Sequence, residues 1–441
     1  MKIPLSPPHV SLSDVLHDRD KLNRILGVSP LVRGRYEHWD KVRHLTPPEG
    51  LTSREWWLGI KLARGQILKS LPLFDKNGDE LRFSTPDTIL RMLHEIDQLA
   101  GGRIEMSEEV TNPATRDRYV VSSLIEEAIT SSQLEGASTT ADVAKDMLRT
   151  GRRPADRSER MIVNNFLGMQ FVRERAAEPL TPQFVHELHR MLTVDTLDDP
   201  SKAGRFREDG DQIRIVDEVG NVLHDPPKAV ELPERLERLC AFANDRPDDT
   251  FLHPVVRAAI LHFQMGFDHP FVDGNGRTAR ALFYWSMLSQ GYWLTEYLSI
   301  SSILKKAPSQ YARSFLHSES DDNDLTYFLD YQLSVVRRAI DDLQRYLKKK
   351  IAEITQVESL LKRSTEFNHR QLALLGHALR HPGARYTIRS HQMSHRVVYE
   401  TARTDLTTLA ERALLVQRRR GKKYEFVAPP DLHERLRAGV G

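Results

Sequence analysis

Between about residues 115 and 345 the apolar residues recur every three or four positions, which is the spacing of an amphipathic helix. Three segments that show it are VSSLIEEAI, FVHELHRMLTV and VVRAAILHFQMGF. One segment, DQIRIVDEVGNVLHDPP, breaks the pattern, because Ile213, Ile215 and Val222-Leu223 flank Gly220-Asn221 as the strands of a β-hairpin flank its turn. The sequence therefore predicts a mainly α-helical core that carries one small β-hairpin.

The chain before and after this core has a different character. The N-terminal part combines Pro-rich starts with short helical patterns and one hairpin signal, Asn77-Gly78 in LFDKNGDELRF. A long, charged helix is expected from about Tyr331 to Lys362. After it come one helix, a helix-turn-helix-like stretch and two strands around Gly421, a pattern typical of a winged helix. We expect four parts: a mostly helical N-terminal region (1–112), the helical core (113–345), a helical linker (346–364) and a winged helix-turn-helix domain (365–432).

Composition excludes several classes of protein. The chain has a single cysteine, Cys240, so it can form no intrachain disulfide and no structural zinc site built from several cysteines. The N-terminal residues have no apolar core of signal-peptide length, and no apolar run approaches the roughly 18 residues that span a bilayer. We therefore expect a cytoplasmic protein with no membrane partner.

Charge is unevenly distributed along the chain. From Arg363 to the end there are 15 Lys and Arg against 7 Asp and Glu, a net charge of +8, whereas the first 362 residues have a net charge of −6. The predicted recognition helix, from about Tyr399 to Leu409, displays Arg403. The predicted wing carries Arg418, Arg419 and Arg420. These four arginines are candidate DNA contacts, although winged helices also dock proteins and both kinds of partner stay open.

The most informative segment of the sequence is HPFVDGNGRTAR. Gly274, Asn275 and Gly276 permit a tight turn whose backbone N–H groups converge at the start of a helix, where the positive end of the helix dipole favours a polyphosphate. Arg277 and Arg280 lie three positions apart, hence on one helix face, and can clamp successive phosphates. These residues predict a phosphate-binding cradle.

Two further residues of the segment supply chemistry beside the cradle. Asp273 stands where a carboxylate would hold Mg²⁺ against phosphate oxygens. His269 is the side chain able to accept a proton near neutral pH, because the ordinary pKa of histidine is about 6.5. It is the natural general base for an attacking hydroxyl.

HPFVDGNGRTAR resembles the motif of the Fic (Fic/Doc) family, HxFx(D/E)GNGRxxR, at every fixed position. In that family the motif lies on the loop and helix of an all-helical core, and the usual reaction is AMP transfer from ATP to Ser, Thr or Tyr of a target protein. The Doc subgroup phosphorylates instead and has Lys where this chain has Gly276, a difference that favours adenylylation here.

The resemblance implies a role for each matching residue. His269 corresponds to the base, Asp273 to the Mg²⁺ ligand, and Asn275 with its two neighbouring glycines to the anion hole. Arg277 and Arg280 correspond to the phosphate clamps.

Upstream, the segment SSQLEG, from Ser131 to Gly136, resembles the inhibitory motif (S/T)xxxE(G/N) of the family's N-terminally inhibited class. Ser131 and Glu135 are four positions apart, so they face the same way if residues 122–136 are helical. The resemblance implies that Glu135 pairs with Arg280 and occupies the place of the γ-phosphate of ATP. Some family members use this same glutamate to remove AMP.

The predicted hairpin corresponds in position to the family's flap, which aligns a target segment by strand pairing. Its candidate docking residues are Ile213, Arg214 and Ile215. For the adenine base the sequence offers Tyr311, which aligns loosely with a tyrosine pair near the nucleotide in relatives, but Ala312 replaces the second tyrosine.

The sequence thus predicts an autoinhibited protein adenylyltransferase that uses ATP and Mg²⁺ on a hydroxyl-bearing target protein, in a family whose members often form homodimers. Two alternatives stay open. One is a DNA-binding regulator whose core only senses nucleotide, and the other is an enzyme that mainly removes AMP from its target.

Overall fold

The computed structural model describes residues 3–101, 113–150, 152–211, 213–217, 220–244, 251–363, 366–381, 383–420 and 423–439. The chain divides into two compact units. The first comprises Met1–Gly102 and Ser123–Ile340, and the second Arg103–Ser122 and Asp341–Gly441. Two helices, α6 and α15, contribute residues to both units.

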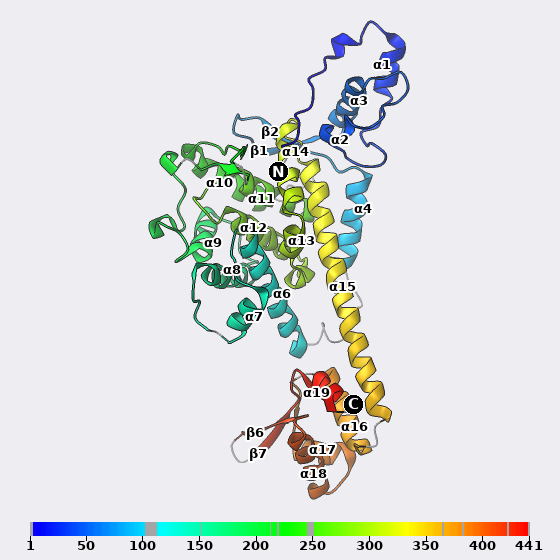
Figure 1. Cartoon of the computed structure of the whole chain (residues 1–441), viewed down its shortest axis with the longest axis vertical. Coiled ribbons are helices and arrows are strands. Elements are labelled where there is room, and N and C mark those ends of the chain that lie inside the picture. The colour runs from blue at the N-terminus through cyan, green and yellow to red at the C-terminus, as the bar shows by residue number, and fades with distance from the viewer. Residues whose placement is uncertain are drawn as a thin grey trace. The chain divides into compact units, whose positions relative to one another are not determined.

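The protein is mainly α-helical, as predicted (Figure 1). The N-terminal region of the first unit contains α1 (Arg19–Leu26), α2 (Trp39–Val42), α3 (Ser53–Gly65), β1 (Lys69–Phe74), β2 (Glu80–Phe83) and α4 (Asp87–Ile96). The core follows with α6 (Pro113–Leu134), α7 (Ala141–Thr150), α8 (Arg157–Glu174), α9 (Pro182–Thr193), β3 (Ile215–Val216), β4 (Val222–His224), α10 (Leu232–Asn244), α11 (Pro254–Asp268), α12 (Asn275–Ser289), α13 (Ile300–Lys306), α14 (Pro308–Ser320) and α15 (Thr326–Arg363).

Local sequence signals explain where several core helices begin. Asp156 caps α8 by accepting a hydrogen bond from the backbone N–H of Glu159, and Thr181 caps α9 in the same way. Proline stands at the first position of both α9 and α11, where its missing N–H removes no intrahelical bond.

The centre of the first unit is the antiparallel pair α11 and α12, which lie side by side (Figure 1). Nearly every residue of both helices is buried. A helix buried on all sides is normally apolar all round, yet α12 buries the polar side chains of Asn275, Arg277 and Arg280 near its start. Such buried cations require compensating contacts, and these contacts shape the site described below.

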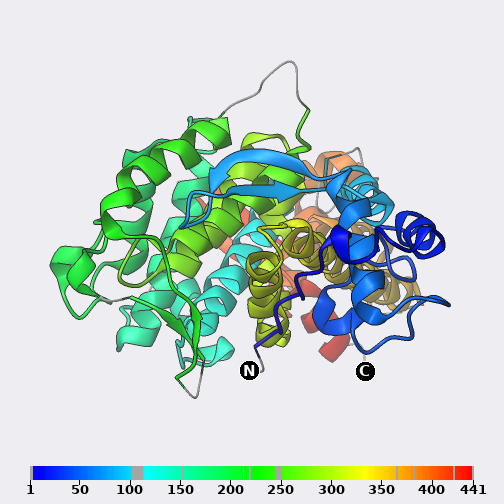
Figure 2. The ribbon, with the colours of Figure 1, turned by 90° about the horizontal axis from the view of Figure 1, so that it is seen from above.

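The N-terminal region packs against this core. Strands β1 and β2 form the predicted antiparallel hairpin and lie across the core helices (Figure 2). The side chain of Arg235, on α10, donates to the carbonyl oxygens of Phe74 and Asp75 and pairs with Asp268 at 2.7 Å. Because Asp268 is the last residue of α11, the hairpin supports the helix end that precedes His269.

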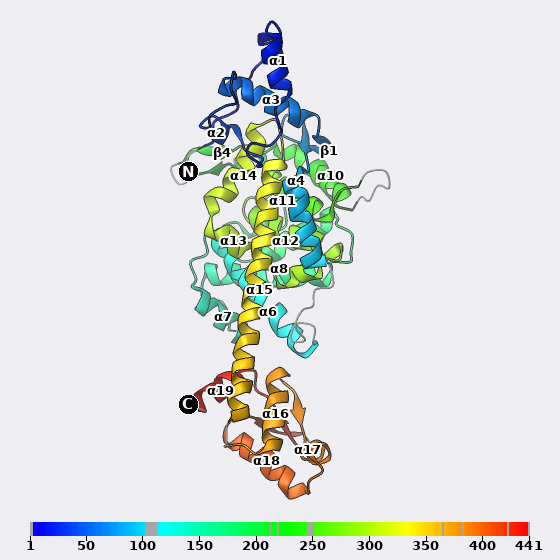
Figure 3. The same ribbon diagram turned by 90° about the vertical axis from the view of Figure 1, so that its right-hand side faces the viewer.

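Helix α15 begins at Thr326, five residues before the predicted start, and ends at Arg363. Its residues up to Ile340 belong to the first unit. Within that unit α4 runs beside it (Figure 3), and Arg337 pairs with Glu95 at 3.3 Å.

The second unit contains the elements that the C-terminal sequence predicts, namely one helix, a helix pair and two strands. They are α16 (His369–Arg380), β5 (Arg385–Tyr386), α17 (Ile388–His395), α18 (Tyr399–Glu411), β6 (Val416–Arg420), β7 (Lys423–Val427) and α19 (Leu432–Gly439). Strand β5 and helix α19 were not predicted, and β5 completes a three-stranded antiparallel sheet in the order β5-β7-β6. The predicted turn residue Gly421 lies outside the described residues.

Among the helices of the described segments, none is both long and apolar enough to cross a membrane.

Replacing Arg235 with methionine should destabilise the protein, because Asp268 is 4 % exposed and would lose its buried counter-charge. We expect the free energy of unfolding to fall by about 3–5 kcal/mol, measured by urea titration. Arg238→Met is the matched control one turn further along α10, since Arg238 and its partner Glu234 are exposed. That control should change stability by less than about 1 kcal/mol. Equal effects of the two substitutions would contradict this account of the Arg235 contacts.

Candidate active site

The segment HPFVDGNGRTAR, called the motif segment below, connects α11 to α12. His269 adopts the left-handed backbone conformation, with φ of 44° and ψ of 56°, and ends α11. A non-glycine residue in this region is uncommon and marks a constrained position. The surrounding contacts must therefore hold His269 in place.

Arg207 supplies that constraint. Its Nε donates to the carbonyl oxygen of His269 at 2.8 Å, and its backbone N–H donates to the carbonyl oxygen of Pro270 at 2.9 Å. The guanidinium also donates to the carbonyl oxygen of Pro227. Arg207 therefore fixes the backbone at the start of the motif segment.

His269 is neutral at physiological pH in this environment. Burial lowers its pKa to about 4, although a hydrogen bond to the carbonyl oxygen of Gly266 acts in the opposite direction. The Nδ1 atom lies 3.3 Å from that carbonyl oxygen, so Nδ1 carries the proton. The other nitrogen, Nε2, then has a free lone pair that can accept a proton from a substrate.

The turn after His269 is closed by Asn275. Its Oδ1 accepts from the backbone N–H of Phe271 at 2.9 Å, and its Nδ2 donates to the carbonyl oxygen of the same residue at 2.8 Å. The family resemblance implies that Asn275 and its two neighbouring glycines form an anion hole. Both ends of the Asn275 side-chain amide contact the backbone of Phe271, so this side chain shapes the turn.

His189 of α9 supports the same turn, and sequence reasoning missed it. Its Nδ1 accepts from the backbone N–H of Gly204 at 2.9 Å, so Nε2 carries the proton and donates to the carbonyl oxygen of Asp273 at 2.8 Å. The His189 ring also stacks on Phe271, with ring centroids 3.7 Å apart. Nothing in the helical pattern around His189 signals this role, because its partners are backbone atoms far away in the sequence.

The turn leads directly into the start of α12. Gly274 is the N-cap residue with φ of 81°, and a Cβ atom there would lie 2.7 Å from the side chain of Thr193. Glycine is therefore required both by conformation and by space. The first N–H groups of a helix have no intrahelical partner, so the start of α12 can accept an anion.

Arg277 faces this site from within the protein. Its side chain is 0 % exposed, and Nη1 donates to the carbonyl oxygen of Leu192 at 2.7 Å. Its Nε and Nη2 have no hydrogen-bond partner among the described residues, and Nη2 lies 3.6 Å from the carboxylate of Asp273. A buried guanidinium with free donors beside a helix start suits a phosphate oxygen.

Arg280 is held by residues at the end of α6 and just after it. Its Nε donates to the Ser131 hydroxyl at 2.9 Å, and Nη2 donates to the Ser131 carbonyl oxygen at 3.1 Å and to Glu135 Oε1 at 2.8 Å. Ser131 lies near the end of α6, Glu135 follows that helix, and Gly136 reverses the chain with φ of 92°. The structure thus brings Ser131, Glu135 and Arg280 together.

Gly276 makes room for this contact. A Cβ atom at position 276 would lie 2.2 Å from Glu135 Oε1, so any side chain there would displace the glutamate. Burial raises the pKa of Glu135, but Arg280, Arg277 and His269 together outweigh burial and hold that pKa below its ordinary value. Glu135 is therefore an anion at neutral pH.

A cavity of about 220 Å³ opens over these residues. Glu135, His269, Gly276 and Arg280 contribute its polar end. The remaining wall is mostly apolar and consists of Ile215, Leu223, Phe267, Tyr311, Ala312, Phe315 and Leu316, with Gly266, His224 and Glu319. A small cavity with an apolar wall and an anion-binding end fits a nucleotide better than a simple inorganic anion.

Strands β3 and β4 form the predicted hairpin beside this cavity. They pair antiparallel through Ile215 with His224 and Val216 with Val222. Of the three candidate docking residues, Ile215 lies in β3 and lines the cavity, while Ile213 and Arg214 precede the strand. The hydroxyl of Tyr311 lies 2.7 Å from His262 Nε2, so this tyrosine is fixed in the wall.

Asp273 stands in the turn that leads into α12, with its side chain 39 % exposed. Its Oδ1 accepts from the backbone N–H of Gly274 at 2.6 Å, and its Oδ2 faces Arg277 and Arg157 at 3.6 and 3.8 Å. No group of three or more His, Cys, Asp or Glu suited to a metal occurs among the described residues. A single accessible carboxylate suits Mg²⁺ that takes its other ligands from phosphate and water.

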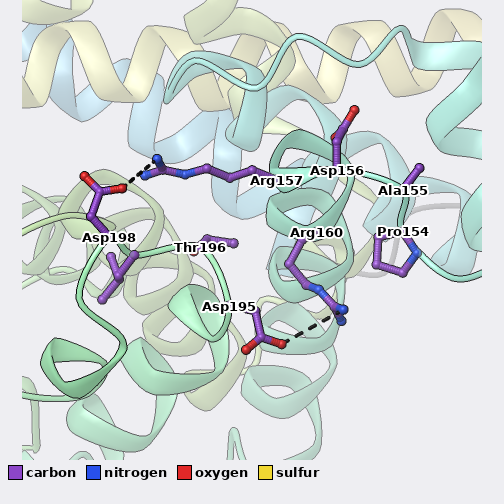
Figure 4. Close-up of a pocket in the computed structure, with 9 residues that line it drawn as sticks. Pro154, Ala155, Asp156, Arg157, Arg160, Asp195, Thr196 and Asp198 are labelled. Atoms are coloured by element: carbon purple, nitrogen blue, oxygen red, sulfur yellow. Dashed lines mark hydrogen bonds and ion pairs between the residues drawn. The ribbon is translucent and has the colours of Figure 1, made fainter.

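A second cavity, of about 390 Å³, lies between α8 and the segment after α9 (Figure 4). Its arginines already have acidic partners: Arg157 pairs with Asp198 at 3.1 Å and Arg160 with Asp195 at 4.0 Å. Because these cations are compensated and no histidine lines the cavity, the first cavity is the better candidate active site.

The candidate DNA contacts lie apart from this chemistry in the sequence. Arg403 is on α18 and pairs with Glu400 at 3.6 Å. Arg418 and Arg419 are exposed on β6, whereas the side chain of Arg420 lies outside the described residues.

Comparison with known proteins identifies the region around the cavity. The model of the Fic/DOC family matches residues 179–287, which include the motif segment. The protein adenylyltransferase Fic of Nematostella vectensis is 34 % identical over 119 residues, which cover 26 % of this chain and 25 % of that protein. The protein of the same name from Drosophila mojavensis is 31 % identical over 166 residues, covering 36 % of this chain and 30 % of that protein.

These curated relatives are matched over only a quarter to a third of their own length. A solved structure of a Fic family protein from Desulfovibrio desulfuricans covers 78 % of this chain and 96 % of its own, with 19 % identity and a TM-score of 0.50, and so supports the fold. Residues 179–287 of this chain are a domain of the Fic/DOC family.

Proposed function

We propose that this protein transfers AMP from ATP to a hydroxyl side chain of another protein, and that Glu135 restrains the reaction. The observation that carries the proposal is a cavity lined by a neutral histidine, a buried arginine and a residue of a helix start. His269 and Arg280 both line it, and Arg277 stands at the adjoining helix start. The curated relatives named protein adenylyltransferase Fic support the same chemistry.

In the proposed reaction the target hydroxyl oxygen attacks the α-phosphorus of ATP. The bond between that phosphorus and the bridging oxygen of pyrophosphate breaks, and the hydroxyl proton passes to His269 Nε2. The N–H groups at the start of α12, with Arg277, stabilise the negative charge that develops on the phosphates. Most of the catalytic effect then comes from positioning, which Asn275, His189 and Arg207 secure.

Asp273 is the residue that would hold Mg²⁺, which would neutralise phosphate charge and orient the leaving group. Its side chain is accessible at the edge of the turn, and no other protein carboxylate needs to participate. Two arginines near Oδ2, Arg157 and Arg277, hold this carboxylate close to the phosphate-binding turn.

The proposed brake follows from competition for Arg280. The guanidinium is 1 % exposed and makes hydrogen bonds to Ser131 and Glu135. A γ-phosphate that used Arg280 would have to displace the Glu135 carboxylate, because two anions repel strongly in a poorly hydrated site. ATP would therefore bind weakly, or with its α-phosphate misplaced, until Glu135 moves.

The flap supports a protein as the acceptor. Strand β3 is short and has an exposed residue, Val216, beside the cavity-lining Ile215. An extended target segment can pair with such an edge through its backbone, which brings a hydroxyl to the cavity without strict sequence requirements. Homodimer formation, which the family resemblance implies, belongs to this proposal as well and is tested by sedimentation.

A second candidate function is DNA binding by a winged helix formed by α16–α18 and the sheet β5-β7-β6. The exposed arginines of β6 and the net charge of +8 after residue 362 favour it. Fluorescence anisotropy with duplex DNA tests this, since phosphate contacts give an affinity that falls steeply with salt. The alternative of protein docking would leave DNA affinity undetectable.

Replacing Glu135 with glycine should release the reaction. We expect weak incorporation of label from α-³²P-ATP in the wild-type protein and strong incorporation in Glu135→Gly. Adding His269→Ala to that variant should lower the rate by roughly a hundred- to ten-thousandfold, the usual contribution of a general base. No label in any of the three proteins would contradict the transferase proposal, and loss of label from a premodified target would indicate AMP removal.

The charge state of His269 can be measured directly. With ¹³C-labelled histidine, the resonance that disappears in His269→Ala should not shift between pH 8 and about pH 5, because the pKa is lowered to about 4. Exposed histidines should titrate near their ordinary value of about 6.5 in the same spectra. A His269 midpoint near 6.5 would contradict the neutral base at acidic pH.

A further inference from the structure

Helix α6 is anchored at a second place, eight residues before Glu135. Glu127 is buried, with an exposed fraction of 1 %. Its Oε2 accepts from the Ser299 hydroxyl at 2.9 Å and from the backbone N–H of Ser301 at 3.0 Å, and its Oε1 accepts from the Ser301 hydroxyl. Ser299 is the N-cap of α13, so the carboxylate sits against the positive end of that helix.

The residues that hold Glu127 are connected to α12 through Tyr284. The Tyr284 hydroxyl donates to the carbonyl oxygen of Leu298 at 3.2 Å and accepts from the backbone N–H of Ile300 at 2.9 Å. Tyr284 follows Arg280 by four residues on α12, so the two side chains leave the same helix face. One side chain of that face contacts Glu135, and the other fixes the segment that binds Glu127.

Helix α6 is therefore attached to α12 at two points. The first is direct, from Arg280 to Ser131 and Glu135. The second runs from Tyr284 through residues 298–301 to Glu127. Glu127 and Glu135 are about 12 Å apart along a helix axis, from a rise of about 1.5 Å per residue. A helix attached at one point can rotate about it, whereas attachment at two points fixes both its rotation and its register.

Two further residues of α6, on either side of Glu127, also contact residues 297–299. Ser123 donates to the carbonyl oxygen of Tyr297 at 3.0 Å, and the hydroxyls of Thr130 and Ser299 lie 3.2 Å apart. With Glu127, these residues follow the three- and four-residue spacing of one face of α6. The contacts of Glu127 and Ser123 are hydrogen bonds to a buried carboxylate and to a backbone carbonyl oxygen, which are directional and so specify position more sharply than apolar packing.

We propose that Glu127 is a positioning residue of the brake, which keeps Glu135 against Arg280 by locking α6 onto the start of α13. The inference rests on the proposed function, because Glu127 acts only through Glu135. It assigns Glu127 no contact with ATP or with the target. Weakening the lock should therefore activate the enzyme, an effect that general damage to the fold would not produce.

The test uses the full chain with Glu127→Ala, Glu127→Gln, the matched control Glu126→Ala, and Glu135→Gly as the fully released reference. Glu126 is the neighbouring glutamate, half-exposed and paired only at the surface with Lys145 at 3.2 Å. Two quantities are measured for each protein: hydrogen–deuterium exchange of the amides in residues 123–135, and label incorporated from α-³²P-ATP.

We expect Glu127→Ala to exchange faster and to incorporate roughly five- to thirtyfold more label than wild type, because the brake then spends less time engaged. Glu127→Gln keeps the shape and part of the hydrogen bonding, so it should lie between wild type and Glu127→Ala in both measurements. Glu126→Ala should match wild type. Wild-type labelling of Glu127→Ala, with strong labelling of Glu135→Gly, would overturn the positioning role, whether or not exchange became faster.

If circular dichroism shows that Glu127→Ala does not fold, Ser301→Ala replaces it. That substitution removes one hydrogen-bond partner of Glu127 and leaves the carboxylate held by Ser299 and a backbone N–H. It should raise labelling in the same direction, and unchanged labelling would overturn the inference. Absence of label in Glu135→Gly itself would instead count against the proposed function, so the two failures are distinguishable.

Discussion

The buried contact between Arg280 and Glu135 is the interaction on which the rest of the site depends. A guanidinium that is 1 % exposed cannot remain without compensating anions or hydrogen-bond acceptors. Ser131 and Glu135 supply them from outside the motif segment, and Gly276 leaves the space that they need. The positive charge of Arg280, which would suit a phosphate, is therefore already compensated by Glu135.

A second feature of the site is that the backbone of the motif segment is held by several side chains. His269 is held in a left-handed backbone conformation by Arg207, and the turn after it is closed by Asn275 and His189. All of these contacts involve backbone atoms of the motif segment, so they fix the direction of its N–H groups independently of any ligand. Glu135, in contrast, follows the end of α6 and depends on the placement of that helix. The motif segment is therefore preorganised, and Glu135, the proposed brake, is attached separately.

The sequence predicted the parts whose physical task is local. The motif segment contains a histidine, a tight turn and two arginines within twelve consecutive residues. The pairs Asn77-Gly78 and Gly220-Asn221 each predict the turn of a hairpin. Supports that act over long distances were missed: His189 and Asp273 are 84 residues apart, and Arg207 and His269 are 62 apart. Their partners are backbone carbonyls, which are the same in every residue and leave no mark in a sequence. Strand β5 has two residues, too few for any periodic pattern.

The central claim is that Glu135 occupies the place of the γ-phosphate at Arg280. Calorimetric affinities for ATP and for AMP, in the wild-type protein and in Glu135→Gly, test it most directly because AMP has no γ-phosphate. Glu135→Gly should bind ATP roughly tenfold or more tightly than the wild-type protein and should bind AMP with little change. The reason is that the Glu135 carboxylate competes only with the γ-phosphate, which AMP lacks. Equal tightening of both nucleotides, or no change in either, would contradict it.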